Sequence, residues 1–189
     1  LCLALHRNTD IQTAAPRDLR RQEFLDRDLR LESLVERQIC NAEAAHTYTT
    51  IGNMNEHGLA ITESTWGGRQ ELAGSGMIDY GSLIYITLER ARTAREAIRT
   101  MTDLVKTYGY ASEGESFTIA DPTEVWIMEM IGKGKTDKGA VWVARRVPDD
   151  CIAGHANHSR IHRFPLKDKT GNTLYSPDVI KFARKMGYF

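Results

Sequence analysis

A change in amino-acid usage near residue 44 divides the chain into two parts that differ in their capacity to fold. All fifteen Gly, seven Tyr and three Trp residues of the 189-residue sequence lie beyond this point, as do all eight Lys residues. A chain of this length with 41% hydrophobic residues can form one domain with a real core, and we assign that domain to residues 45–189. Residues 1–44 form an atypical leader that contains Arg but no Lys.

The leader is open to three interpretations. Helix-forming residues run from Asp18 to Gln38 with leucines at loose helical spacing, so the first interpretation is a real amphipathic helix. The second is a solvated charged tail, and the third is a stretch translated in the wrong reading frame ahead of a true coding region. The sequence begins with Leu1, has its first methionine at Met54 and stops at Phe189 directly after a helical pattern. Both ends are therefore expected to be cut.

Charge and hydropathy exclude several classes of function. Lys and Arg together number 25 and so do Asp and Glu, so no net charge attracts nucleic acid or an anionic membrane surface. No apolar run approaches the roughly 20 residues of a membrane span, and the opening LCLALHRNTD meets charged side chains too early for a signal peptide. Three cysteines without a C-x-x-C pair imply neither a disulfide framework nor a zinc site. We expect no nucleic-acid or membrane partner. The chain as written is cytoplasmic by this criterion, which does not fix the compartment of a longer protein.

The first half of the domain is expected to contain two strands and then two helices. Residues 46–52 and 58–66 have the β-branched content and alternation of strands. A helix is expected from Asp79. The sequence Thr93-Ala94-Arg95-Glu96 is a capping box, which predicts a second helix that ends at Gly109.

The second half is expected to be mostly strands. Residues 115–131 predict a β-hairpin around the turn at Asp121-Pro122, and residues 140–147 and 151–157 predict two more strands. A last helix is expected to begin at Pro177 with Ser176 as its cap. Helices inserted between antiparallel strands, with no βαβ alternation, indicate an α+β fold in which helices cover a sheet.

Two apparent motifs are better explained without chemistry. Residues 132–135 (GKGK) lack the spacing and setting of a phosphate-binding loop. His155 and His158 would point to opposite faces of an extended segment, and no carboxylate or Cys near His162 completes a metal set, so we expect no metal. Cys151 lies too far from His155 in an extended segment to form a nucleophile–base pair, and we expect it to be a small buried core residue.

Asparagines in two stretches suggest a catalytic site. Asn53 and Asn55 lie between the first two expected strands, and Asn157 lies in CIAGHANHSRI. Each could simply form a turn, but amide hydrolysis needs fixed hydrogen-bond donors aimed at the developing oxyanion, and a side-chain amide is a suitable neutral donor. Asn157 is the best candidate for this role. Glu63 could bind a substrate ammonium group if it points to the active face, and otherwise it is a solvated strand carboxylate.

Five stretches carry a family resemblance: HTYTTIGNMNEHGLAITESTWGGR, IDYGSLIYITLERARTAREAI, YGYASEGESFTIADPTEVWIMEMIGKG, GAVWVARRVPDDCIAGHANHSRI and YSPDVIKFARKMGYF. Through them residues 46–189 resemble the N-terminal-nucleophile (Ntn) hydrolase cysteine dipeptidases of the dipeptidase-A type. The resemblance implies an αββα sandwich that hydrolyses dipeptides or short peptides without a metal or organic cofactor. It also implies an N-terminal Cys whose thiolate attacks the substrate and whose α-amine acts as the base.

The resemblance implies roles for particular residues. Asn157 resembles the oxyanion-hole Asn of related Ntn-hydrolases, and Ser64 and Thr65 correspond to the strand that lines the pocket, where Asn55 and Glu63 are further substrate-binding candidates. Cys2 needs only the removal of Leu1 to become N-terminal, but the residues after it do not resemble the family's first strand, so the chain is expected to lack its own nucleophile.

Three functional hypotheses follow. The first is a thiol dipeptidase of which this chain is a partial or frame-shifted copy. The second is a non-catalytic protein in the manner of the secernins, which share the superfamily, and the third is hydrolysis of other amides. A sheet without its first strands leaves an open edge, so we expect marginal stability and a possible homo-oligomer.

Overall fold

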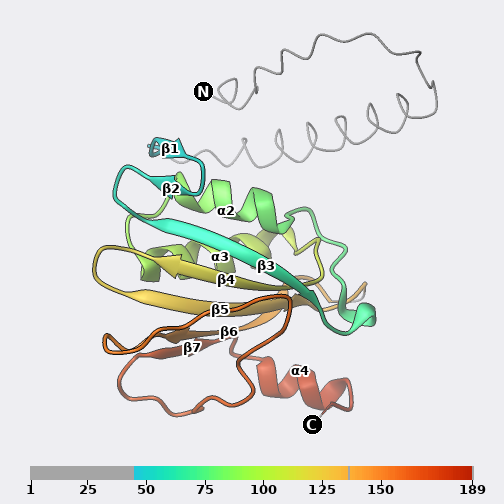
Figure 1. The fold of residues 1–189 in the computed structure, drawn as a ribbon. Helices are drawn as coiled ribbons and strands as arrows, with labels where there is room; N and C mark the ends of the chain where they lie inside the picture. The colour runs from blue at the N-terminus through green and yellow to red at the C-terminus, as the bar shows by residue number, and fades with distance from the viewer. Residues whose placement is uncertain (1–44, 136, 189) are drawn as a thin grey trace, which may run out of the picture. The chain divides into compact units, whose positions relative to one another are not determined.

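The computed structural model describes residues 45–188 apart from residue 136, and the leader with Cys2 and the expected helix at 18–38 lies outside these residues. The described part forms an antiparallel sheet with three α-helices and one short 3-10 helix, an α+β fold (Figure 1). The strands are β1 (Thr50–Ile51), β2 (Met54–Asn55), β3 (Ala60–Gly67), β4 (Gly114–Ala120), β5 (Val125–Gly132), β6 (Ala140–Arg146) and β7 (Thr173–Tyr175). The helices are η2 (Gln70–Leu72), α2 (Tyr80–Leu88), α3 (Ala94–Tyr108) and α4 (Val179–Lys185).

The sheet is a simple meander in which each strand pairs with the next one along the chain. Its order is β1-β2-β3-β4-β5-β6-β7, and every pair is antiparallel. In the central register Glu63 lies opposite Phe117, which lies opposite Met128, while Ser64 lies opposite Ser116. Because successive side chains alternate between faces, these two rows lie on opposite faces of the sheet.

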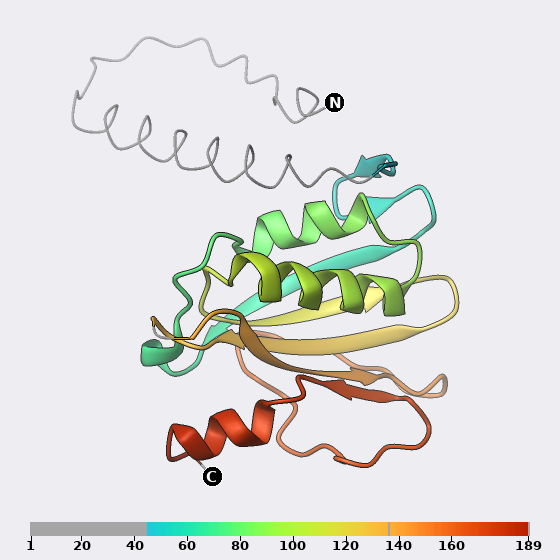
Figure 2. The same cartoon turned by 180° about the vertical axis from the view of Figure 1, so that it is seen from behind.

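One face of the sheet is apolar and is covered by α2 and α3. Both helices lie on the same side of the strands, as the two opposite views show (Figures 1 and 2). The α3 sequence repeats apolar residues at helical spacing, so one stripe of the helix is buried. The fully buried side chains of this layer include Ile61, Leu83, Leu88, Ile98, Met101, Phe117, Ile119, Trp126 and Met128.

The caps of α3 confirm the helix that the sequence predicts. The Thr93 side chain accepts a hydrogen bond from the Glu96 amide at 3.2 Å, and Gly109 ends the helix at a φ of +80° that suits glycine. The return bond of the expected capping box differs, because the Glu96 carboxylate accepts from the amide of Arg92 instead of Thr93. The predicted helix from Asp79 is confirmed as α2, with Asp79 accepting from the Ser82 amide.

The predicted hairpin is confirmed as β4 and β5. Asp121 organises its turn, because one carboxylate oxygen accepts from the amides of Thr123 and Glu124 at 2.7 and 2.9 Å. The other oxygen accepts from the Ala94 amide at 2.8 Å, so the same side chain also satisfies the first turn of α3. The predicted strands at 58–66 and 140–147 are confirmed as β3 and β6, whereas the strand expected at 46–52 is reduced to Thr50–Ile51.

The strand expected at residues 151–157 was wrong, whereas the last helix is confirmed but begins two residues later than expected. Residues 147–172 form a long connection without helix or strand, which crosses the face of the sheet that α2 and α3 leave open (Figures 1 and 2). On the side of β6 away from β5, the pairing strand is β7. Cys151 is exposed, so its expected place in the core was also wrong. Helix α4 begins at Val179, after a turn at Ser176 whose carbonyl accepts from the Val179 amide. No helix in residues 45–188 is long and apolar enough to cross a membrane.

Candidate active site

Polar side chains gather on the sheet face that the connection 147–172 crosses. Ser64 on β3 and Ser116 and Thr118 on β4 share this face by the strand register. Ser116 is completely buried, and its hydroxyl has no hydrogen-bond partner within the described part of the chain. Burying a hydroxyl without a partner is costly, so a polar neighbour beyond the described residues would stabilise this position.

His155 joins the connection to two strands. Its Nδ1 lies 2.6 Å from Ser64 Oγ, and its Nε2 lies 2.7 Å from Thr118 Oγ1. Ser64 also donates to the carbonyl of Ala156 at 2.9 Å. Because Ser64 has a single hydroxyl hydrogen, this arrangement is complete when His155 carries its proton on Nδ1 and accepts from Thr118 at Nε2. His155 therefore fixes residues 155–156 against β3 and β4.

Asn157 lies next to this anchor with its side-chain amide directed at β3. Its Nδ2 donates to the carbonyl of Thr65 at 2.6 Å. An amide nitrogen has two hydrogens, so this bond fixes the plane of the group and leaves one N–H free of partners among the described residues. A fixed neutral donor with a free N–H is suited to stabilise an oxyanion.

Glu129 on β5 anchors the connection further along. The side chain is 6% exposed, and its Oε1 accepts from the backbone amides of Arg160 and Ile161, at 3.0 Å for Ile161. Backbone N–H donors compensate the buried carboxylate without a basic side chain. The segment 155–161 is thus held by side chains from three strands.

Comparison with known proteins places this arrangement in a family. The model of peptidase family C69 matches residues 28–189, which is most of the chain. The chain belongs to peptidase family C69. The match begins at residue 28, inside the leader, and it covers the complete connection that carries His155 and Asn157.

Several proteins that are similar to this chain are named dipeptidases. A probable dipeptidase of Latilactobacillus sakei is 33% identical over 136 residues, which are 69% of this chain and 27% of that protein. A dipeptidase of Bifidobacterium longum is 31% identical over 111 residues, or 57% of this chain and 19% of that protein. A probable dipeptidase A of Streptococcus pyogenes is 34% identical over 116 residues, or 61% of this chain and 23% of that protein. The chain thus spans between 19% and 27% of the length of these relatives.

Asn55 has a structural role, because it joins the end of α2 to the loop before β3, and it does not line the candidate site. It is 5% exposed, and its Nδ2 donates to the carbonyls of Leu88 and Ala91 at 2.7 Å each. Its Oδ1 accepts from the amides of His57 and Leu59 at 3.0 and 3.2 Å. All four hydrogen-bonding positions are occupied, so the Asn55 side chain has no group left for the substrate that the sequence suggested it would bind.

Glu63 and the Thr65 side chain lie on the helix-covered face, away from Asn157. The register pairs Glu63 with Phe117 and Thr65 with Glu115, both on the α2 and α3 side. The condition for an ammonium-binding role, that Glu63 points to the active face, is therefore not met. Thr65 serves the site through its backbone carbonyl, and of the expected pocket residues on β3 only Ser64 presents its side chain there.

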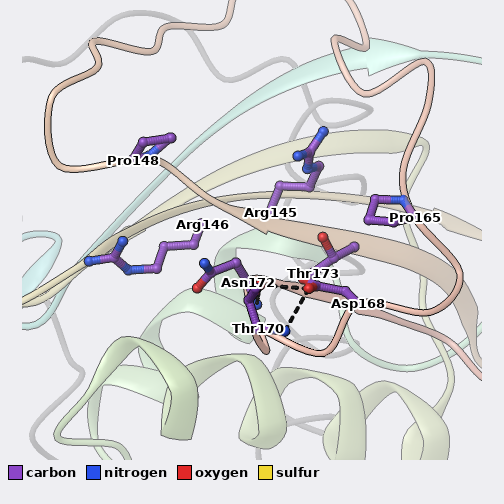
Figure 3. A pocket seen from close by; sticks show the side chains of 8 residues that line it. All are labelled: Arg145, Arg146, Pro148, Pro165, Asp168, Thr170, Asn172 and Thr173. Carbon is purple, nitrogen blue, oxygen red and sulfur yellow. Dashed lines mark hydrogen bonds between the residues drawn. The ribbon is translucent and has the colours of Figure 1, made fainter.

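Two surface depressions lie outside this arrangement. One of about 350 Å³ lies beside α2 and is lined by Asn53, Thr62, Glu63, Tyr80, Gly81, Ile84 and Tyr85. The other, of about 260 Å³, is lined by Arg145, Arg146, Pro148, Pro165, Asp168, Thr170, Asn172 and Thr173 (Figure 3). Its arginine side chains extend in different directions, and Arg146 pairs with Glu124 and Asp149 at 3.2 and 2.6 Å. This depression therefore does not present two free cations to an anionic ligand.

The anchoring roles of His155 and Glu129 were not predicted from the sequence. His155 was considered as a metal ligand and as a base for Cys151, and no group of three His, Cys, Asp or Glu side chains within residues 45–188 is placed to hold a metal ion. The sequence pattern that could have pointed to these anchors is the alternation of β4. It places Ser116 and Thr118 on a face where a sandwich core would carry apolar residues.

Proposed function

We propose that this chain carries part of the active site of a cysteine dipeptidase of the Ntn-hydrolase type. Residues 45–188 would supply one sheet of the αββα sandwich, and the face that carries Ser64 and Asn157 would border the substrate. Family membership and the names of the relatives support peptide hydrolysis. The observation that carries the proposal is the Asn157 amide, which Thr65 fixes and which has one N–H without a partner among the described residues.

The reaction assigns one task to each group. The thiolate of an N-terminal Cys attacks the peptide carbonyl, and the carbonyl oxygen becomes an oxyanion that accepts a hydrogen bond from Asn157. The tetrahedral intermediate then collapses, the C–N bond breaks, and the leaving amine takes a proton from the enzyme's α-ammonium group. Water hydrolyses the thioester and restores the thiol. The substrate is a dipeptide or short peptide, and Ser64 lines its pocket.

Asn157→Ala in the intact protein tests the oxyanion role. Removing one oxyanion donor reduces kcat by about 100- to 1000-fold with a smaller effect on KM, so dipeptide hydrolysis should fall by that amount. Asn172→Ala is the matched control, because Asn172 is an exposed asparagine beside β7 in the other depression. Equal activity of both variants and the unmutated protein would remove Asn157 from the mechanism.

The nucleophile lies outside the described residues, and Cys2 is the candidate within this chain. Cys2→Ala should abolish hydrolysis by the chain if Cys2 becomes N-terminal, whereas Cys151→Ala, which removes an exposed thiol, should not. A chain that is inactive with both cysteines intact supports the partial-copy proposal. Translation of the gene upstream of codon 44 in all frames should then reveal a strand led by Cys, and an uninterrupted frame without one would favour a non-catalytic, secernin-like protein.

A further inference from the structure

A second polar cluster lies on the opposite face of the sheet, beneath α2 and α3. We call it the acid cluster, and it consists of Glu63 and Thr65 on β3, Glu115 on β4, and Tyr110 and Ser112 before β4. Glu115 is completely buried and Tyr110 is 1% exposed. Two carboxyl groups are therefore placed in a layer that otherwise holds the apolar core.

The hydrogen bonds of the acid cluster are incomplete. Glu115 Oε1 accepts from Thr65 Oγ1 at 2.9 Å and from Ser112 Oγ at 3.1 Å. In contrast, Glu115 Oε2, Glu63 Oε2 and the Tyr110 hydroxyl are buried and have no partner among the described residues. Two ionised carboxylates cannot bond to each other, because both are acceptors only, and an unpaired buried carboxylate is strongly destabilising.

No basic side chain among the described residues pairs with Glu63 or Glu115. The titratable groups that face it are Asp79 at the start of α2, Tyr80 and Tyr85 on α2, and the cluster's own Tyr110. Helix α3 presents the apolar Met101 and Val105, and β5 places Met130 opposite Glu115; all three side chains are buried. The two carboxyl groups can form the missing hydrogen bond with each other, because one proton bound between them turns one acceptor into a donor.

Electrostatics favour this proton. Burial raises the pKa of Glu115 to about 7, and the hydrogen bond and negative charge of Glu63 act in the same direction. Burial, together with the charge of Glu115, raises the pKa of the Tyr110 hydroxyl, which therefore stays protonated and able to donate. A carboxyl pair that shares one proton is the known response of two acids held in one site.

Thr65 connects the acid cluster to the candidate active site. Its hydroxyl donates to Glu115 on one face of the sheet, and its carbonyl accepts from Asn157 at 2.6 Å on the other. The β3–β4 register shifts between Thr65 and Gly67, so the backbone here departs from the regular ladder. A change in the acid cluster can therefore reach Asn157 through a single residue.

We propose that Glu63 and Glu115 share one proton and that this pair, through Thr65, positions the Asn157 amide. The catalytic part rests on the function proposed above. Loss of the shared proton leaves two adjacent charges, of which that of Glu115 is completely buried, and their repulsion displaces Thr65. Glu63, Glu115 and Thr65 are thus positioning residues, and the Asn157 amide is best placed while the pair holds its proton.

The shared proton is tested on the 189-residue chain without any assay of activity. An unfolded Glu titrates near 4.5, so between that pH and about 7 the folded protein keeps a proton that the unfolded chain has lost. The melting temperature should therefore fall as pH rises through this window. Glu115→Gln imitates the protonated acid and should remove this fall, while the control Glu113→Gln, on an exposed neighbour, should keep it.

A second measurement needs no variant. The infrared carbonyl band of a buried carboxylic acid should be present at pH 5 and disappear with a midpoint near 7. Absence of the band, or an equal pH slope in Glu115→Gln, would overturn the shared proton. A rise in melting temperature with micromolar calcium, together with loss of the titration, would overturn it as well, because the pair would then be a cation site.

The link to Asn157 has its own readout. The side-chain amide signals of Asn157 in a nitrogen–proton spectrum should shift with the same midpoint, and Glu115→Gln should hold them at their low-pH positions. This result stands whether or not the protein hydrolyses peptides. In an active protein, kcat should fall above pH 7 in the unmutated form and less in Glu115→Gln. Asn157 signals that do not follow the titration would overturn the positioning role.

Discussion

Single side chains at this sheet have roles that depend on which face they occupy. Ser64 and Glu63 are neighbours in sequence, yet one contacts His155 on the open face and the other enters the helix-covered layer. Asn55 and Asn157 are both turn-like asparagines in the sequence, but only Asn157 keeps a free N–H among the described residues. The residue type therefore identifies candidate site residues, and their hydrogen-bond partners show which of them are free to bind a ligand.

Asn55→Ala should destabilise the protein without any role in catalysis. The substitution leaves two carbonyls at the end of α2 and two loop amides without their partner, which costs about 2–4 kcal/mol in the free energy of unfolding. Urea unfolding measures the change. Asn172→Ala, at an exposed position, should change the same quantity by less than about 0.5 kcal/mol, and a similar loss in both variants would contradict the structural role of Asn55.

Among the helices and strands, the sequence predicted best those that are defined by contacts between residues close in sequence. The helix caps at Asp79, Thr93 and Gly109 and the turn at Asp121 involve residues within a few positions, and these elements are confirmed. Residues 151–157 have equally good local alternation but form no strand, because β7 pairs with β6 at that edge. The place of a segment in a sheet depends on competing partners distant in sequence, which local patterns do not contain.

The same limit applies to the candidate site. Asn157 could be proposed from its chemistry, whereas its fixation by the Thr65 carbonyl and the anchoring by His155 join residues about ninety positions apart. The acid cluster was missed because Glu115 looks like an ordinary polar residue of an alternating strand. Only the register of β3 and β4 reveals that it is buried next to Glu63.

Asp121 joins the β4–β5 turn to the first turn of α3. Asp121→Ala should therefore lower the free energy of unfolding more than loss of the Thr93 cap alone. Although burial opposes it, hydrogen bonds from Ala94, Thr123 and Glu124 hold the pKa of Asp121 below its usual value of 3.8. Its stabilisation is present above pH 3.8 and is lost as the pH falls through the lower folded value. We expect a loss of about 2 kcal/mol near neutral pH, against about 1 kcal/mol for Thr93→Ala, measured by urea unfolding. Equal losses would show that the α3 contact is dispensable.

For the whole molecule, the meander predicts an ordered gradient of local stability. Strands β3, β4 and β5 lie in the middle of the sheet under α2 and α3, whereas β1, β2 and β7 are short strands at or next to its edges. Amide hydrogen exchange should be slowest in β4 and β5 and fastest in β1 and β7. Uniform protection would contradict this picture and would indicate that the edges are covered, as in the homo-oligomer that the sequence leaves open.

The proposed chemistry also predicts how the intact protein responds to inhibitors. A thiol mechanism needs no metal, so dipeptide hydrolysis should survive EDTA and be lost on alkylation with iodoacetamide. The Cys151→Ala variant removes the exposed thiol of the described residues and should be alkylated and inactivated in the same way. Inhibition by EDTA that added metal reverses would contradict the thiol mechanism.

The connection 147–172 has a consequence for how such a protein can diversify. It carries His155 and Asn157 but contributes no strand to the sheet, and a few side chains of β3, β4 and β5 anchor it. Substitutions between the anchors can reshape the candidate site while the strand pairing and the apolar layer under α2 and α3 stay intact. If the proposed function holds, selection can therefore change which peptides are accepted with little loss of folding stability.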